Sequence, residues 1–120
     1  MGTLGLPSAA LDTHIALDIG CEALSVALAD RLDSVLVVAG FSRLVVDLNR
    51  PPGHPTSIPL TSDGIEIPGN QRLSERKRLR RIEEIFSPYH EAVSTEVQRA
   101  CAQHPKAALI SMHSFTPRID

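Results

Sequence analysis

Apolar positions along the chain fall into two kinds of pattern, short continuous runs and longer stripes with helical spacing. Residues 35–39 (VLVVA), 44–48 (LVVDL) and 107–112 (AALISM) are short runs, and the first two are rich in β-branched valine. Runs of this length and composition are typical of buried strands. We therefore expect three strands, at residues 35–39, 44–48 and 107–112.

The first helical stripe covers residues 14–32. Asp12 and Thr13 are favourable N-cap residues directly before it, and apolar residues then recur on a wide face. Such a face is typical of a helix that packs against a sheet. Gly20 falls in the interior of the predicted helix, where a glycine costs about 1 kcal/mol relative to alanine.

A second, longer helix is predicted for residues 73–103, because apolar residues there recur every three or four positions. Pro88 interrupts the stripe. The helix either restarts there, with Ser87 as N-cap and Pro88 at the first helical position, or continues with a kink. The basic run 75–81 contains Leu79 and has no aromatic residues, so a solvated helix face is favoured over a nucleic-acid patch.

Residues 49–70 separate the second predicted strand from the long helix. This segment holds five prolines and three glycines, which argue against regular structure. Loops of this length inside compact domains are usually functional or disordered. Because apolar residues such as Ile58 and Ile67 punctuate the segment, we expect an ordered loop beside a substrate site, with a turn at 62–64.

A polar cluster follows the predicted strand 44–48. Asp47, Asn49 and Arg50 lie at its carboxyl end, where open α/β sheets bind ligands, and Arg43 lies just before it. A guanidinium suits a carboxylate because its planar fork forms two parallel hydrogen bonds. The cluster is interpreted either as a carboxylate-binding site or as a structural ion-pair network.

Two histidines lie at positions that suggest chemistry. His113 directly follows the predicted strand 107–112, which would fix its backbone for metal binding or for a purely structural contact. His14 and Asp18 are four residues apart and would share one helix face, either as a local surface pair or as functional residues.

Composition sets the broad class. The chain has 120 residues, 42% of them hydrophobic and 22% charged, which fits one soluble domain with a modest core. A net charge of −2 gives no general reason to expect nucleic-acid binding. Cys21 and Cys101 are far apart and are expected to be reduced, buried helix residues. Without a membrane-spanning run or a signal-peptide pattern, a cytoplasmic location is expected and no membrane partner.

Five stretches, in this order and spacing, resemble the N-formylglutamate amidohydrolase family: HIALDIG, SRLVVDLNRPPGHPTSIP, SDGIEIPGN, IFSPYHEA and ISMHSFTP. The resemblance runs from about residue 4 to residue 117 and is most specific in DLNRPPG and MHSFTP. It implies an α/β fold, part of a three-layer α/β/α sandwich with a mixed sheet, like the zinc carboxypeptidases and aspartoacylases. It also implies zinc-dependent hydrolysis of N-formyl-L-glutamate, or a related N-acyl amino acid, to formate and glutamate, as in one route of histidine degradation.

The resemblance also implies residue roles. His113 matches a zinc-binding histidine, and Asp18 is a candidate metal ligand or a carboxylate that supports one. Asn49 and Arg50 match a pair that grips a substrate carboxylate, with Arg43 and Asp47 in support. No catalytic residue is assigned, and neither are roles for His14, His54 and His90.

Members of the family are roughly twice as long, with a strand and metal-binding histidine before the region of residue 4 and a further region after residue 117. The expectation is therefore a single, partial domain over residues 1–120 that lacks a metal ligand and a general base. Two alternatives to an enzyme follow: a non-catalytic domain that binds an acidic small molecule through Arg43 and Arg50, and an interaction domain that uses its basic helix. Missing flanking strands would leave an exposed sheet edge and favour self-association.

Overall fold

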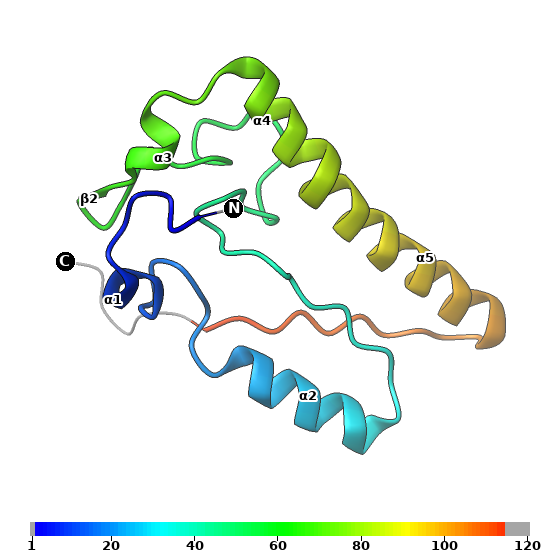
Figure 1. The fold of residues 1–120 in the computed structure, drawn as a ribbon. Coiled ribbons are helices and arrows are strands. Elements are labelled where there is room, and N and C mark those ends of the chain that lie inside the picture. The colour runs from blue at the N-terminus through cyan, green and yellow to red at the C-terminus, as the bar shows by residue number, and fades with distance from the viewer. Residues whose placement is uncertain (1, 115–120) are drawn as a thin grey trace.

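The computed structural model describes residues 2–114, and helices alternate in it with long irregular and extended segments (Figure 1). The helices and strands of this mixed α/β fold are, in order, α1 (Ser8–Leu11), α2 (Cys21–Leu32), β1 (Thr61–Ser62), β2 (Ile65–Glu66), α3 (Pro68–Gln71), α4 (Glu75–Arg81), the π-helical turn η1 (Ile82–Phe86) and α5 (Ser87–Gln103).

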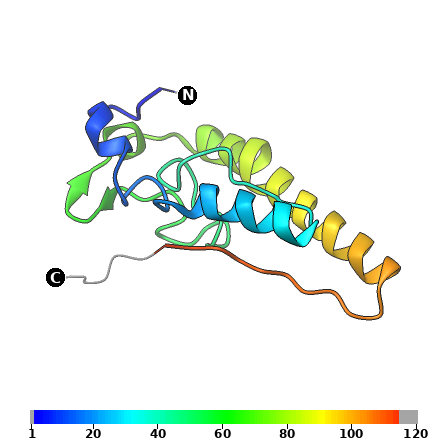
Figure 2. The same cartoon turned by 90° about the horizontal axis from the view of Figure 1, so that it is seen from below.

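The long helix forms one side of the molecule and α2 forms another. Figure 2 shows both running in similar directions, while the N-terminal segment, the hairpin and α3 gather at one end. An extended segment returns from the end of α5 toward that same end. No helix within residues 2–114 is both long enough and apolar enough to cross a membrane.

The predicted long helix is confirmed, and it runs without a break from α4 through η1 into α5. Ser87 has helical angles (φ −62°, ψ −48°), so the alternative in which it begins a new helix is wrong. Pro88 lacks the N–H that an α-helix needs and its ring crowds the preceding turn. The wider π-helical turn directly before Pro88 accommodates this change, which explains how the helix continues.

The first predicted helix begins later than the sequence suggested. Residues 14–20 form turns, and α2 starts only at Cys21. Gly20 is the residue before α2 and has φ +79°, a left-handed conformation that glycine adopts without a steric penalty. The glycine therefore marks the boundary of the helix and not its interior. Contrary to expectation, none of the residues of α2 is buried.

The segment 49–70 contains a small β-hairpin that was not predicted. Thr61 pairs with Glu66 and Ser62 with Ile65 in antiparallel register. The turn expected at 62–64 is confirmed: Asp63 (φ +47°) and Gly64 (φ +74°) both have positive φ, as type I′ hairpin turns require. The rest of the segment is irregular but anchored by Ile58 and Ile67, which are buried.

None of the three predicted strands is present as a paired strand among residues 2–114. Residues 44, 45 and 48 lie in turns and residues 46–47 are irregular, although residues 44–47 are buried. A short apolar run signals burial but does not distinguish a strand from another buried conformation. Residues 34–40 and 107–114 lack helical or β-bridge assignments and have no paired neighbour, although Figure 1 draws them as extended chain.

The core consists of two adjoining clusters beneath the polar loop 42–50. The first contains Leu6, Ile15, Ala16, Leu44 and Ile67, and the second contains Val45, Val46, Ile58 and Ile85. Leu4 packs against both clusters. The run 44–46 is therefore apolar because its side chains enter both clusters, which fixes the position of the polar residues that flank it.

Outside these two clusters, the molecule is less compact than a typical domain of its size. Its accessible surface is 8796 Å² for a mass of 13.0 kDa, whereas a compact chain of this mass exposes about 6,300 Å². Its radius of gyration is 16.0 Å, against about 14 Å for a compact domain of this length. Cys21 is half-buried and Cys101 exposed, so the expectation that both cysteines are buried is wrong, while both are free as expected.

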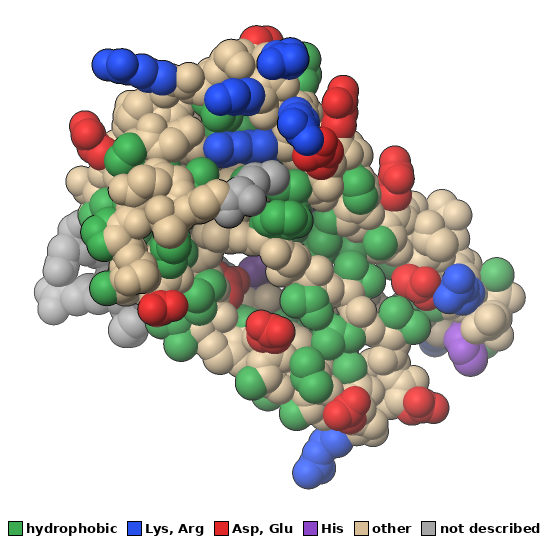
Figure 3. Space-filling model, viewed as in Figure 1, with side chains coloured by type: hydrophobic (Ala, Val, Ile, Leu, Met, Phe, Trp, Pro, Cys, Tyr) green, Lys and Arg blue, Asp and Glu red, His purple; other side chains and the backbone are tan. Residues whose placement is uncertain are grey.

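Most of the exposed large hydrophobic side chains belong to α2 and to the extended segments 34–40 and 107–114. Hydrophobic side chains gather over α2 and the adjoining chain (Figure 3). We use the name open face for the exposed apolar residues of α2 and of the extended chain next to it, without implying that all of them point the same way: Leu24, Val26, Leu32, Val35, Leu36, Val38, Phe41, Leu109 and Ile110.

We propose that the open face drives self-association, because large exposed apolar patches and unpaired extended chain both favour it. Light scattering should show a mass that rises above 13.0 kDa as the protein concentration increases. Replacing Leu109 and Ile110 together by lysine should weaken this rise. Lysine at Leu79, which is also exposed but lies on α4 outside the open face, should not. A monomer of constant mass at high concentration would contradict the proposal.

Candidate functional site

The candidate site is built on the loop 42–50, whose start is held by Ser42. The Ser42 hydroxyl donates to the carbonyl of Ala16 at 2.6 Å and accepts from the Leu44 N–H at 3.2 Å. A short local hydroxyl bond of this kind favours a turn over a strand. Leu44 then points into the core, and Arg43 stays half-exposed above it.

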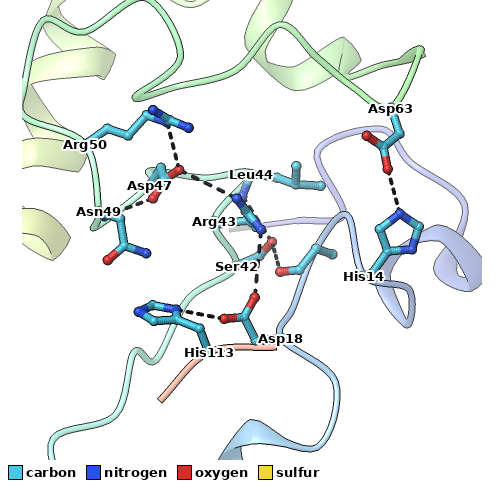
Figure 4. Close-up of polar contacts among 11 residues, drawn as sticks. His14, Asp18, Ser42, Arg43, Leu44, Asp47, Asn49, Arg50, Asp63 and His113 are labelled. Carbon is cyan, nitrogen blue, oxygen red and sulfur yellow. Dashed lines mark hydrogen bonds and ion pairs between the residues drawn. The ribbon is translucent and has the colours of Figure 1, made fainter. Parts of the chain in front are cut away.

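Asp47 is the buried centre of this loop. Its N–H donates to the carbonyl of Ser57 at 2.8 Å, and its carboxylate accepts from the Asn49 N–H at 2.9 Å. The other carboxylate oxygen lies 3.4 Å from Arg50 Nε and 3.9 Å from Arg43 (Figure 4). Only 8% of the Asp47 side chain is exposed, against nearly half of each arginine, so Asp47 holds two guanidinium groups that remain accessible to a ligand.

The charged network continues from Arg43 to His113. Arg43 lies 3.8 Å from one Asp18 oxygen, and the other Asp18 oxygen lies 3.1 Å from His113 Nδ1 (Figure 4). His113 Nε2 lies 2.9 Å from the Ser111 hydroxyl. Residues 95 positions apart in the sequence thus come into contact. The two residues predicted for a metal and three of the four predicted for a carboxylate form one continuous network.

A shallow pocket of about 160 Å³ opens beside the two arginines. This is smaller than the roughly 300–1,000 Å³ of pockets for drug-sized ligands. The segment 56–62 also contributes hydroxyl groups to the pocket lining, and the sequence did not point to them. The pocket is lined by Arg43, Leu44, Asp47, Arg50, Thr56, Pro59, Thr61 and Ser62.

Asn49 contacts the loop through its backbone. Its backbone N–H caps Asp47, but the residue is exposed and is not part of the pocket wall. A side-chain contact between Asn49 and a ligand therefore stays a prediction.

The other histidines lie outside the pocket wall and support neighbouring segments. His14 Nε2 lies 2.6 Å from Asp63, so it holds the hairpin tip and does not pair with Asp18 (Figure 4). His54 Nδ1 accepts from the Thr56 N–H at 3.2 Å. His90 packs on Phe86, with ring centroids 4.3 Å apart, and donates to the carbonyl of Leu48 at 3.0 Å.

A buried polar pair beneath the pocket was also missed. Asn70 is fully buried and donates to the carbonyls of Leu44 (2.8 Å) and Pro59 (2.7 Å). Arg81, 8% exposed, donates to the Asn70 side-chain oxygen (2.8 Å) and to the carbonyl of Val45 (2.7 Å).

Arg81 is the exception to the expectation that the basic run 75–81 is solvated. Burial lowers the pKa of Arg81 below its usual value, and the nearby charge of Arg78 lowers it further. The signal in the sequence is the apolar Ile85, which follows Arg81 by four residues, about one helical turn.

The described residues alone do not complete a catalytic zinc site. Such sites usually take three protein ligands, whereas no group of three histidine, cysteine or acidic side chains within residues 2–114 is placed to hold a metal ion. The contact between Asp18 and His113 has instead the geometry of a carboxylate that orients a histidine ring. Residues 115–117 of the motif MHSFTP lie outside the described part of the chain.

Comparison with known proteins identifies the family of the chain. The chain is similar to the crystal structure of gene product Atu2144 from Agrobacterium tumefaciens, with 40% sequence identity and a TM-score of 0.91 over 97% of this chain. This chain spans 46% of the length of that one. None of the curated proteins compared with the chain matches it. The family model described as N-formylglutamate amidohydrolase matches residues 2–120, and the chain therefore belongs to the N-formylglutamate amidohydrolase family.

Proposed function

We propose that this chain binds the carboxylate of an N-acyl amino acid in the pocket between Arg43, Arg50 and the hydroxyls of segment 56–62. The observation that carries the proposal is the pairing of two half-exposed guanidinium groups with one buried carboxylate at the pocket wall. Asp47 lies 3.4 Å from Arg50 and 3.9 Å from Arg43, so its charge favours positions of both guanidinium groups beside the pocket. Ligand carboxylates form charge-assisted hydrogen bonds with such forks.

The proposed substrate is N-formyl-L-glutamate or a related N-acyl amino acid, hydrolysed to formate and an amino acid. Membership of the family supports hydrolysis of an amide. Two carboxylates on a small ligand match a pocket that offers two cationic groups and several hydroxyls. We propose a cytoplasmic location for this reaction, which two free cysteines support.

Zinc remains part of the proposal, with His113 as a ligand and Asp18 supporting it. The contact between their side chains supports this arrangement. A catalytic site of this kind needs a further ligand from outside residues 2–114. We also propose that the extended segments 34–40 and 107–114 correspond to strands of a mixed sheet in a sandwich like that of the zinc carboxypeptidases.

The alternative function is binding of an acidic small molecule without turnover. It is favoured by one observation, the lack of a complete metal-binding group among the described residues. Binding and turnover are separable, because the first depends on the arginines and the second requires release of formate.

Calorimetric titration of L-glutamate and N-formyl-L-glutamate tests the carboxylate site. Replacing Arg50 by alanine should weaken binding about 10- to 100-fold, the value of a hydrogen bond to a charged group. Lysine at Arg50 should restore part of the loss, because it keeps the charge but not the fork. Alanine at Arg80, an exposed arginine that pairs with Glu84 outside the pocket, is the matched control and should bind as the unchanged protein does.

Formate release from N-formyl-L-glutamate, measured on the same sample together with its zinc content, separates the two functions. Turnover with about one zinc per chain, lost with the metal in His113→Ala, would support hydrolysis. Binding without formate would favour the alternative. If neither ligand binds the unchanged protein, the carboxylate site is wrong.

A further inference from the structure

The two walls of the pocket come from different parts of the chain, and one buried side-chain amide hydrogen-bonds to both. The first wall is the loop that carries Leu44, Asp47 and the arginines, and the second is the segment 56–62. Asn70 donates one side-chain hydrogen bond to each wall, to Leu44 and to Pro59, and both of these residues line the pocket.

The orientation of this amide is fixed. The Asn70 amide has two N–H donors, and both are used on the walls, while its oxygen accepts from Arg81. Arg81 also donates to the Val45 carbonyl, so it ties the amide to the first wall a second time. No buried side-chain polar atom of the described residues lacks a partner. Rotating the amide would place its oxygen against a carbonyl, which is repulsive.

The position of Asn70 is in turn set by the N-terminal segment. The Gly69 N–H donates to the carbonyl of Leu4 at 2.7 Å. A Cβ at position 69 would lie 2.9 Å from the Leu4 Cα, so only glycine permits this approach. α3 is thereby pressed against the core with Asn70 pointing beneath the pocket.

We infer that Asn70 is a positioning residue that sets the spacing between the two pocket walls and so limits the length of the dicarboxylate that binds. This inference rests on the proposed function for its ligand. The arginines lie on one wall and Thr56, Thr61 and Ser62 on the other. The distance between the two walls, which the Asn70 amide maintains, therefore determines how long a ligand must be to contact both.

The test compares Asn70→Asp with two control variants. Aspartate has nearly the same shape and keeps an acceptor for Arg81, but it places an oxygen against a wall carbonyl. Gln71→Ala removes a neighbouring amide that bonds to the Leu60 carbonyl at the surface, and Ile85→Ala destabilises the core without touching either wall bond. The ligands are succinate, glutarate and adipate, which differ only in length.

The unchanged protein should bind one of these dicarboxylates about tenfold more tightly than the next in length, because a difference of one methylene typically has an effect of this size. Asn70→Asp should reduce this ratio to less than about threefold, and both controls should keep it. A general loss of stability would weaken all three ligands without changing the ratio. A ratio that Asn70→Asp leaves unchanged would overturn the inference.

A second measurement needs no ligand and so separates this inference from the proposed function. The Asp47 N–H bonds to Ser57 and also bridges the two walls. Its hydrogen exchange should become at least about tenfold faster in Asn70→Asp and stay unchanged in Gln71→Ala. If no dicarboxylate binds, the carboxylate site fails while this exchange still decides whether Asn70 joins the walls. Unchanged exchange at Asp47 would overturn the inference.

Discussion

Replacing Ile67 by alanine should lower the free energy of unfolding by about 2–5 kcal/mol, the range for truncating a fully buried aliphatic side chain. Ile67 has no exposed surface and lies in the cluster with Leu6, Ile15 and Leu44. Its backbone also links the residue before the hairpin to α3, because its N–H donates to Leu60 and its carbonyl accepts from Asn70. The core is small, so little neighbouring material is available to fill the cavity.

Urea denaturation followed by circular dichroism measures this effect as a shift of the midpoint with an unchanged slope. The matched control is Ile65→Ala, two residues earlier, where the same side chain is 43% exposed and the loss should be below about 1 kcal/mol. Equal losses at the two positions would show that Ile67 is not in the core described above.

Replacing Arg81 by methionine should lower the free energy of unfolding by about 2–4 kcal/mol. The Val45 carbonyl and the Asn70 side-chain oxygen would lose their donor, and each unsatisfied buried acceptor costs about 1–3 kcal/mol. Methionine fills much of the same volume and no longer buries a charge, which offsets part of the loss. No carboxylate of residues 2–114 forms an ion pair with Arg81, so no partner charge is left behind.

The neighbouring Arg80 supplies the comparison for this variant. Its side chain is 72% exposed and pairs with Glu84, and methionine there should leave the urea midpoint unchanged. The two changes are chemically identical and one position apart. A difference in stability between the two variants therefore reports the effect of the buried position of Arg81. If Arg81→Met is as stable as Arg80→Met, the bonds of Arg81 to the loop do not stabilise the fold.

Local sequence patterns predicted the elements that depend on residues close together in the sequence. The long helix followed from its stripe of apolar residues, and the hairpin turn followed from Ser62, Asp63 and Gly64. The strands at 35–39 and 107–112 failed because a strand exists only with a partner, and the described chain supplies none. The N-terminal helix was predicted seven residues too early because Gly20 was read as an interior residue, whereas its positive φ makes it a boundary.

Only the part of the candidate site that is contiguous in the sequence could be predicted. Arg43, Asp47 and Arg50 lie within eight residues, so their mutual contacts could be anticipated from the sequence. The contact between Asp18 and His113 was suggested only by the family resemblance. Asn70 could not be identified at all, because nothing in its neighbourhood reveals that two distant carbonyls converge on its side chain.

The π-helical turn η1 sets the angular phase of the long helix. Nine positions separate Arg81 from His90, and at about 100° per residue a regular α-helix would place them on opposite sides. Both nevertheless bond to the same loop, at Val45 and at Leu48. The additional residue held by a π-helical turn reduces their separation by about 100°. Removing one residue from 82–86 would therefore leave a regular α-helix in which Arg81 and His90 are eight positions and about 80° apart, so that both would still face the loop.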